Sequence, residues 1–151
     1  MKSIIIIAAL FLIGNSVKAQ FVSAEIQAAG LTCSMCSRAV DKQLQTLDFV
    51  DSVGINLSSA TFVLHFKKNK IIDFDVIKTK VEDAGFSVAS LKAVYHFNQQ
   101  QVDANDTLMY HQTMFQFVQC KSQILNGDVT FKILNKGFMR DKEFKKNCII
   151  N

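Results

Sequence analysis

The chain has no proline and no tryptophan among its 151 residues, and it has only 6 glycines and 4 cysteines. Four cysteines are too few for a disulfide-stapled mini-protein of this length. The formal net charge of +4 is too small for a chain whose main partner is nucleic acid. Apolar residues make up 49% of the chain, which excludes a disordered tail and a collagen-like repeat. The length therefore fits one medium domain or two small ones.

The start of the chain has the pattern of a targeting segment. Lys2 gives a positive start, residues 4–13 form an apolar run, and Ala19 offers a small residue at a cleavage point. This pattern predicts a secretory signal peptide over residues 1–19, cleaved after Ala19, and a periplasmic or secreted mature protein. The run is shorter than the ~20 apolar residues that span a bilayer, so an uncleaved anchor is the weaker alternative. No later segment is long and apolar enough, so we expect no membrane span after cleavage.

Residues 20–90 show two similar half-units that combine a helix with strands. Ala24, Ile26 and Ala28 alternate with other residues, which is typical of a half-buried strand. Gly85 follows the second helical stripe, where a left-handed cap is expected. The expected elements are strand 24–29, helix 34–47, strand 50–57, strand 60–67, helix 74–84 and strand 86–91. This order predicts an α+β fold, the ferredoxin-like βαββαβ sandwich, with two helices on one face of a four-stranded antiparallel sheet.

Residues 91–151 show a different pattern, dominated by short alternating runs. We expect a polar loop over 98–106, one long strand over 109–120 and a further strand over 129–134. Asn126-Gly127 is a strong signal for a tight hairpin turn. The segment therefore predicts a small β-rich module of three to five antiparallel strands. About 60 residues is near the lower limit for an independent core, so we expect it to pack on the first domain or to form a homodimer.

Cys33 and Cys36 form a CxxC pair at the start of the first predicted helix. Unpaired N–H groups and the helix dipole favour negative charge there, so we expect a lowered thiol pKa and an available thiolate. Two thiolates suit a soft ion such as Cu(I), Hg(II) or Zn(II). A two-ligand site fits Cu(I) or Hg(II) better than Zn(II), which prefers four ligands. Met35 between the cysteines can add a thioether.

Three motifs in residues 30–86 resemble the heavy-metal-associated domain family of copper chaperones, copper-pumping ATPases and periplasmic mercuric-ion-binding proteins. Residues 30–36, Gly-Leu-Thr-Cys-Ser-Met-Cys, resemble the family's G-M-T-C-x-x-C motif. Residues 53–57, Val-Gly-Ile-Asn-Leu, resemble its V-x-V-N-L strand, and residues 81–86, Val-Glu-Asp-Ala-Gly-Phe, resemble its I-E-D-x-G-[FY] motif. The motifs occur in the family's order. The resemblance does not cover residues 92–151.

The resemblance implies that Cys33 and Cys36 bind one soft ion, with Cu(I) as the leading choice. The expected role is capture and delivery to a donor or acceptor protein that has exposed thiolates. Leu31 takes the place of the family's methionine, which packs beneath the loop, and Phe86 takes the position that shields the metal. Arg38 on the first helix can steer an acidic partner, although an ordinary solvated charge is the simpler interpretation.

Other functions for the cysteine pair stay open from the sequence. A periplasmic mercuric-ion scavenger has the same motif and a signal peptide. A thiol–disulfide oxidoreductase, a structural disulfide and a non-metal interaction module are further alternatives, although the chain lacks the proline that a thioredoxin-type site needs. We find no nucleophile–base pair, paired carboxylates or phosphate loop, so we expect a binding protein and not an enzyme.

Residues beyond the CxxC motif offer two further candidate groups. Cys120 and Cys148 are expected to form a disulfide that closes the second module, which adds ~3.5 kcal/mol in the chain-entropy model. A second copper site built from His96, Met109, His111 and Met114 is a weaker hypothesis. Its ligands are irregularly spaced, and methionines at strand positions usually belong to a core.

Overall fold

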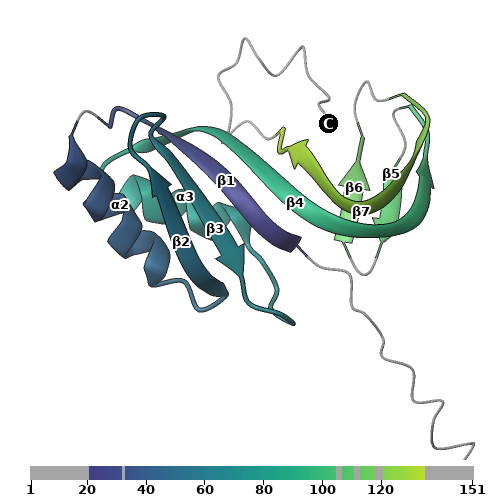
Figure 1. The fold of residues 1–151 in the computed structure, drawn as a ribbon, viewed down its shortest axis with the longest axis horizontal. Helices are drawn as coiled ribbons and strands as arrows, with labels where there is room; N and C mark the ends of the chain where they lie inside the picture. Colours follow the sequence, from purple (N-terminus) through teal and green to yellow (C-terminus); the bar gives the residue numbers. More distant parts are fainter. Residues whose placement is uncertain (1–20, 32, 105–106, 111–112, 118–120, 135–151) are drawn as a thin grey trace, which may run out of the picture.

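The computed structural model describes residues 21–31, 33–104, 107–110, 113–117 and 121–134. The predicted signal peptide, Cys120, Cys148 and His111 lie outside the described residues, so those predictions stand untested. The elements in chain order are β1 (Phe21–Ala29), α2 (Ser34–Gln45), β2 (Val50–Asn56), β3 (Thr61–Phe66), α3 (Phe74–Asp83), β4 (Ser87–Val102), β5 (Thr107–Tyr110), β6 (Thr113–Gln116) and β7 (Gln123–Lys132) (Figure 1).

The first six elements confirm the predicted βαββαβ order. Their strands lie in the sheet order β2-β3-β1-β4, and each neighbouring pair is antiparallel. The register places Ala24 opposite Leu64 and Ile26 opposite Leu91. This is the ferredoxin-like arrangement, in which both helices cover one face of the sheet (Figure 1).

An aliphatic core joins this face of the sheet to the helices. The alternating residues of β1 and β3 face inward because side chains on a strand alternate between the two faces. The helices contribute residues three to four positions apart, as the sequence predicted. The large side chains that are fully buried in this core are Ile26, Val40, Leu44, Phe62, Leu64, Ile77, Val81 and Leu91. Burial of each such side chain stabilises the fold by roughly 1.5–3 kcal/mol.

Strand β4 extends well past the end that the sequence predicted. The expected strand 86–91 and the alternating run after it form one continuous strand of 16 residues. The predicted polar loop is therefore wrong over residues 98–102, which are the last part of β4. The predicted boundary after residue 90 lies inside this strand. The division into two domains stays a prediction.

Strand β7 pairs with β4 and adds a fifth strand to the sheet, in the order β2-β3-β1-β4-β7. Asn126 and Gly127 lie inside β7, so the predicted hairpin turn is wrong. In the β4–β7 register, Asn98 and Gln99 lie opposite the single residue Asn126, which is a β-bulge. Gly127 has φ 75° and Gln99 has φ 46°. The Asn-Gly signal thus marks a left-handed backbone residue at a bulge, where the sheet curves strongly (Figure 1).

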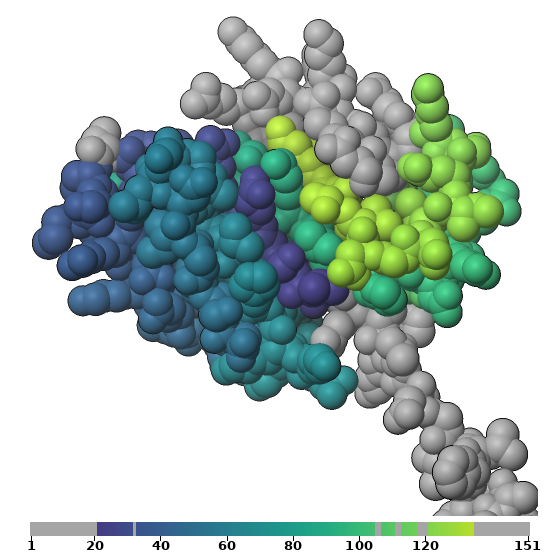
Figure 2. Space-filling view, viewed as in Figure 1, coloured from purple at the N-terminus to yellow at the C-terminus, as the bar shows by residue number. Residues whose placement is uncertain are grey.

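Strands β5 and β6 replace the single long strand that was predicted over residues 109–120. They pair with each other as a separate two-stranded sheet. Their inner face closes an aromatic core against β4 and β7. Its buried residues are Tyr95, Phe97, Val102, Phe115, Phe117, Leu125 and Val129. In the space-filling view, part of β1, in purple, lies between the teal strands β2 and β3 and the yellow-green β7 (Figure 2).

We call residues 21–94 the first lobe and residues 95–134 the second lobe. Phe21 contacts the cores of both lobes. Among the described residues, neither helix has the length and apolar character needed to cross a membrane.

Candidate metal centre

The cysteine pair lies at the corner between β1 and α2. Gly30 directly follows β1 and has φ 84°, a conformation that glycine adopts without steric cost. Leu31 is half-buried and packs against the aliphatic core. This anchors the loop from below, as the resemblance implied, and leaves the next residues at the surface.

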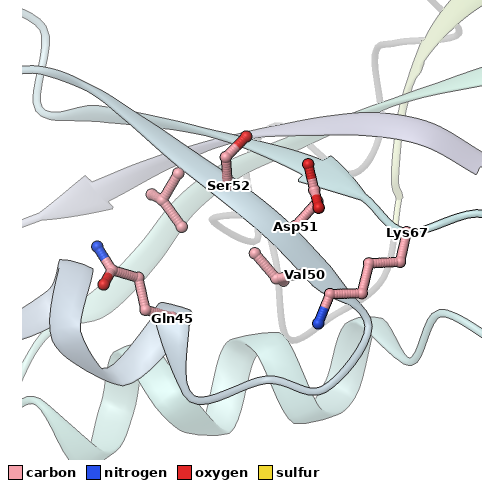
Figure 3. A pocket seen from close by; sticks show the side chains of 6 residues that line it. Gln45, Val50, Asp51, Ser52 and Lys67 are labelled. Carbon is pink, nitrogen blue, oxygen red and sulfur yellow. The ribbon is translucent and has the colours of Figure 1, made fainter.

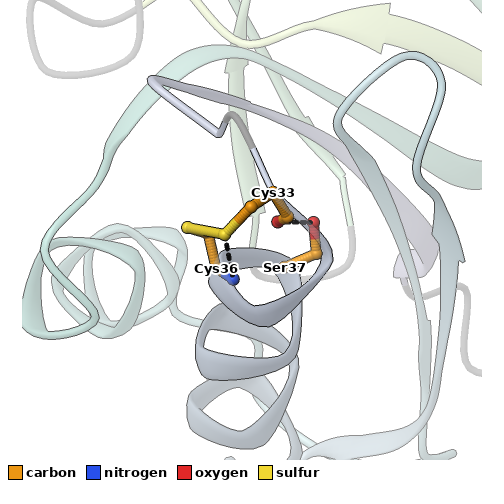
Figure 4. Close-up of a disulfide and its surroundings, with 3 residues drawn as sticks. All are labelled: Cys33, Cys36 and Ser37. Atoms are coloured by element: carbon orange, nitrogen blue, oxygen red, sulfur yellow. Dashed lines mark hydrogen bonds between the residues drawn. A yellow bond between two sulfur atoms is a disulfide. The ribbon is translucent and has the colours of Figure 1, made fainter.

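Cys33 is the N-cap of α2 and Cys36 lies in its first turn. The Cys33 Sγ accepts a hydrogen bond from the Cys36 backbone N–H at 3.2 Å, the role that serine or aspartate usually takes (Figure 4). The Ser37 hydroxyl donates to the Cys33 carbonyl oxygen at 3.5 Å. The Cα atoms of the two cysteines are 5.3 Å apart. Both sulfurs are therefore held at the positive end of the helix dipole.

The two sulfurs form a disulfide in this structure. The sequence pattern predicted a pair of free thiols, and this pair would become free thiols only after a two-electron reduction of the disulfide. The pair is also accessible, because Cys33 is exposed and Cys36 is half-buried. Met35 between them is 72% exposed. The disulfide matches the structural-disulfide alternative from the sequence. Because the bond lies at the surface, a reductant in solution can reach it.

Phe86 reaches the loop from the end of α3. The Gly85 N–H donates to Glu82 O at 2.8 Å and the Phe86 N–H donates to Val81 O at 3.2 Å, which is a Schellman motif. Gly85 has φ 87°, so the predicted left-handed cap is confirmed. The motif turns Phe86 toward the loop, where its Cδ1 lies 3.9 Å from the position a Cβ would take on Gly30. The structure thus brings Phe86 beside the cysteine loop.

The charged groups near the cysteine pair favour negative charge on the two sulfurs. The first turn of α2 contains no acidic residue. Arg38 is exposed on the same helix. Among the described residues, no three histidine, cysteine or acidic side chains gather as a metal site. At this corner the two cysteine sulfurs are the candidate ligands, with the thioether of Met35 between them in the sequence.

A shallow pocket lies at the opposite end of α2. Gln45, Val50, Asp51, Ser52, Val53 and Lys67 line it (Figure 3). A 12-residue helix is about 18 Å long, so this pocket is separate from the cysteines. Nearby, the Lys70 ammonium hydrogen-bonds to the Asp48 carboxylate at 2.9 Å and holds the pKa of Asp48 below its ordinary value. We assign no function to this pocket.

The structure places His96 of the weaker copper hypothesis apart from the two methionines, while His111 lies outside the described residues. His96 Nδ1 lies 2.6 Å from Asp128 Oδ1. His96 alternates with Tyr95 and Phe97, so it points away from the aromatic core. Met109 and Met114 are exposed and lie on β5 and β6. The expectation that these methionines belong to a core is wrong, because residues 109 and 114 alternate with the buried face of their sheet.

The fold and the site together define a small ferredoxin-like domain that exposes a cysteine pair at its first strand–helix corner. The family model of the heavy-metal-associated domain matches residues 25–87 of the chain. The chain belongs to the heavy-metal-associated domain family. The match ends where β4 begins.

Two curated relatives are similar to part of the chain. The chain is 32% identical over 68 residues to the probable copper-exporting P-type ATPase of Archaeoglobus fulgidus, covering 45% of this chain and 8% of the ATPase. It is 31% identical over 64 residues to the copper chaperone CopZ of Bacillus subtilis, covering 42% of this chain and 91% of the chaperone. The chain thus spans a small part of the ATPase and nearly all of the chaperone.

Two solved structures are similar to part of the chain. A CopZ metallochaperone has a TM-score of 0.41 and 25% identity, over 44% of this chain and 98% of the other. The yeast copper transporter domain, solved in apo and Cu(I)-loaded states, has a TM-score of 0.39 and 28% identity, over 43% of this chain and 88% of the other.

Proposed function

We propose that the reduced protein binds one Cu(I) ion through the thiolates of Cys33 and Cys36 and delivers it to a partner protein. The observation that supports this proposal is the placement of both sulfurs at an accessible helix N-terminus. We further propose that the protein works outside the cytosol, on the strength of the N-terminal sequence pattern.

The chemistry of the pair favours a soft monovalent ion. Two thiolates are preferred ligands for Cu(I), and their combined charge is balanced by the ion and the positive helix end. The Cys36 N–H that now donates to Cys33 Sγ would form a stronger, charge-assisted bond to a thiolate. The names of the curated relatives specify copper, which supports copper over mercury.

An open two-ligand site suits transfer as well as binding. A thiolate of the partner can attack the ion while one cysteine leaves, so the ion moves without being released into water. Phe86 beside Gly30 limits access from the α3 side. The exposed Arg38 offers an electrostatic contact to an acidic partner.

Anaerobic Cu(I) titration of reduced protein against a chromophoric competitor tests the proposal. We expect the Cys33→Ser/Cys36→Ser variant to lose one tightly bound equivalent relative to the unchanged chain. Ser34→Ala is the matched control, because it alters the same exposed turn and leaves both sulfurs in place. Equal copper uptake by the double variant and the unchanged chain would contradict the proposal.

The disulfide in the structure favours thiol–disulfide exchange as a second candidate function. In that reaction the Cys33 and Cys36 thiols become a disulfide and two electrons pass to a substrate disulfide, which is reduced to two thiols. Insulin reduction by the pre-reduced protein, with a regenerating thiol reductant, tests it. Turnover lost in Cys36→Ser would support exchange, and a rate equal to that of the reductant alone would reject it.

A further inference from the structure

Met109 on β5 and Met114 on β6 lie directly opposite each other. Their side chains are 62% and 66% exposed. The pairs on either side, Leu108 with Phe115 and Tyr110 with Thr113, belong to the other face of this small sheet. The structure thus places two thioethers side by side on a surface facing away from the aromatic core.

The buried face holds this surface in position. Phe115 is 7% exposed, and its ring centroid lies 4.9 Å from that of Tyr95 and 5.6 Å from that of Phe131. The hydroxyl of Tyr110 accepts a hydrogen bond from the Asn98 N–H at 3.0 Å. Because β5 and β6 pack on β4 and β7, the pairing of Met109 with Met114 does not depend on a bound ion.

The distance between the strands matches the needs of a two-coordinate soft ion. Directly opposite residues have Cβ atoms about 4.5–5.5 Å apart. A metal–sulfur bond of about 2.3 Å, as in zinc thiolates, puts two ligands on opposite sides of an ion about 4.6 Å apart. Methionine has three rotatable bonds, so its sulfur can adjust within this range. Thioethers select soft ions such as Cu(I).

We propose that Met109 and Met114 form a second soft-metal site, which binds one monovalent ion of the Cu(I) type through their two sulfurs. Thioethers do not form disulfides, so this site binds whether Cys33 and Cys36 are oxidised or reduced. Neutral donors give weaker binding and faster exchange than a thiolate pair. The site does not require that the cysteine pair binds copper, so the two proposals can fail separately.

Methyl NMR of the full chain, labelled at the methionine methyl carbons, tests the site with Ag(I) as a redox-inert probe in chloride-free buffer. The background is Cys33→Ser/Cys36→Ser, which removes the competing pair. We expect the Met109 and Met114 methyl signals to move together in one transition. The Met35 signal is the internal control for a single exposed methionine and should stay in place at the same Ag(I) concentration.

Met109→Leu and Met114→Leu complete the test, because leucine keeps the apolar volume and removes the sulfur. Each variant should weaken Ag(I) binding at the remaining methionine at least tenfold and leave the tyrosine fluorescence unchanged. Three results would overturn the proposal: methyl signals that do not move, a remaining methionine that responds as before, or a Met35 response equal to that of the pair.

Discussion

The sheet of this protein is covered by two helices over its first lobe and by a two-stranded sheet over its second. The core of the first lobe is mainly aliphatic, whereas four of the seven buried residues in the core of the second lobe are aromatic: Tyr95, Phe97, Phe115 and Phe117. Aromatic rings bury a large area for each residue, which lets a short segment build a core. The difference shows how one sheet can be extended beyond a family fold.

The two lobes are joined through β4 and through one aromatic side chain. Phe21 lies 4.8 Å from Phe74 of the first lobe and 4.9 Å from Tyr95 of the second, measured between ring centroids, and both contacts are edge-to-face. Strand β4 pairs with β1 over its first part and with β7 over its second. We therefore expect the two lobes to unfold as one cooperative unit.

Truncation of an aromatic core residue should have the largest effect on stability. It also tests whether the two lobes unfold as one cooperative unit. Phe115→Ala and Phe62→Ala, one in each lobe, should each lower the free energy of unfolding by about 3–5 kcal/mol. The chain has 2 tyrosines, Tyr95 and Tyr110, and both contact the second core, whereas the described helices lie in the first lobe. Tyrosine fluorescence and helical circular dichroism in urea thus report the lobes separately.

In a cooperative molecule both signals shift to the same new midpoint in each variant. A Phe115→Ala protein whose tyrosine signal is lost first, while the helical signal keeps its original midpoint, would show that the lobes unfold independently.

Glycine substitutions should have an intermediate effect and compare the two lobes at single residues. Gly85 and Gly127 have φ 87° and 75°, and a Cβ on either would meet no atom within 4 Å. Alanine at each should therefore cost only the left-handed backbone energy, about 1–2 kcal/mol. Urea denaturation measures both. Gly54→Ala is the control: its added Cβ would make ordinary contacts at 3.8 Å with Val63, so it should not destabilise by this amount. Equal losses at all three positions would reject the backbone explanation.

The smallest effect we predict is a pH dependence of stability that arises from Tyr95, a residue of the second lobe. Burial raises the pKa of Tyr95 above its ordinary value of 10.0, while its hydrogen bond with Thr113 acts in the opposite direction. The folded protein therefore keeps this proton to higher pH than the unfolded chain. The contribution to stability is fully present below the unfolded pKa and is lost as pH rises through the folded pKa. Urea midpoints should fall more steeply above pH 10.0 in the unchanged chain than in Tyr95→Phe. Parallel curves would contradict the assignment.

The sequence predicted the first lobe well because its signals are local. The alternation in β1 and β3, the Asp73 cap of α3 and the Gly85 turn each act within a few residues. The cysteine corner was predictable for the same reason, because a CxxC pair before a helical stripe implies a helix N-terminus. Phe86 was placed at the loop by resemblance, and the Schellman motif supplies its physical cause.

The second lobe was predicted less well because its pairing is not local. Asn126-Gly127 supplies a left-handed glycine, and the same dipeptide serves a hairpin or a bulge according to what lies across the strand. The sequence named Met109 and Met114 as candidate copper ligands, but it did not show that they pair, because residues 109–120 were predicted to form one strand. Met109 precedes Tyr110 by one residue and Met114 follows Thr113 by one residue. This symmetric spacing was the sequence signal for the pair.

By itself, the sequence determined the elements of the first lobe and the position of its two sulfurs, since short-range backbone and side-chain preferences suffice for both. Only the tertiary structure decided how far β4 runs, which strand lies beside it and which methionines face each other. Those features depend on hydrogen bonds between strands that are far apart in the chain, as in the pairing of Val102 with Gln123 and of Lys92 with Lys132.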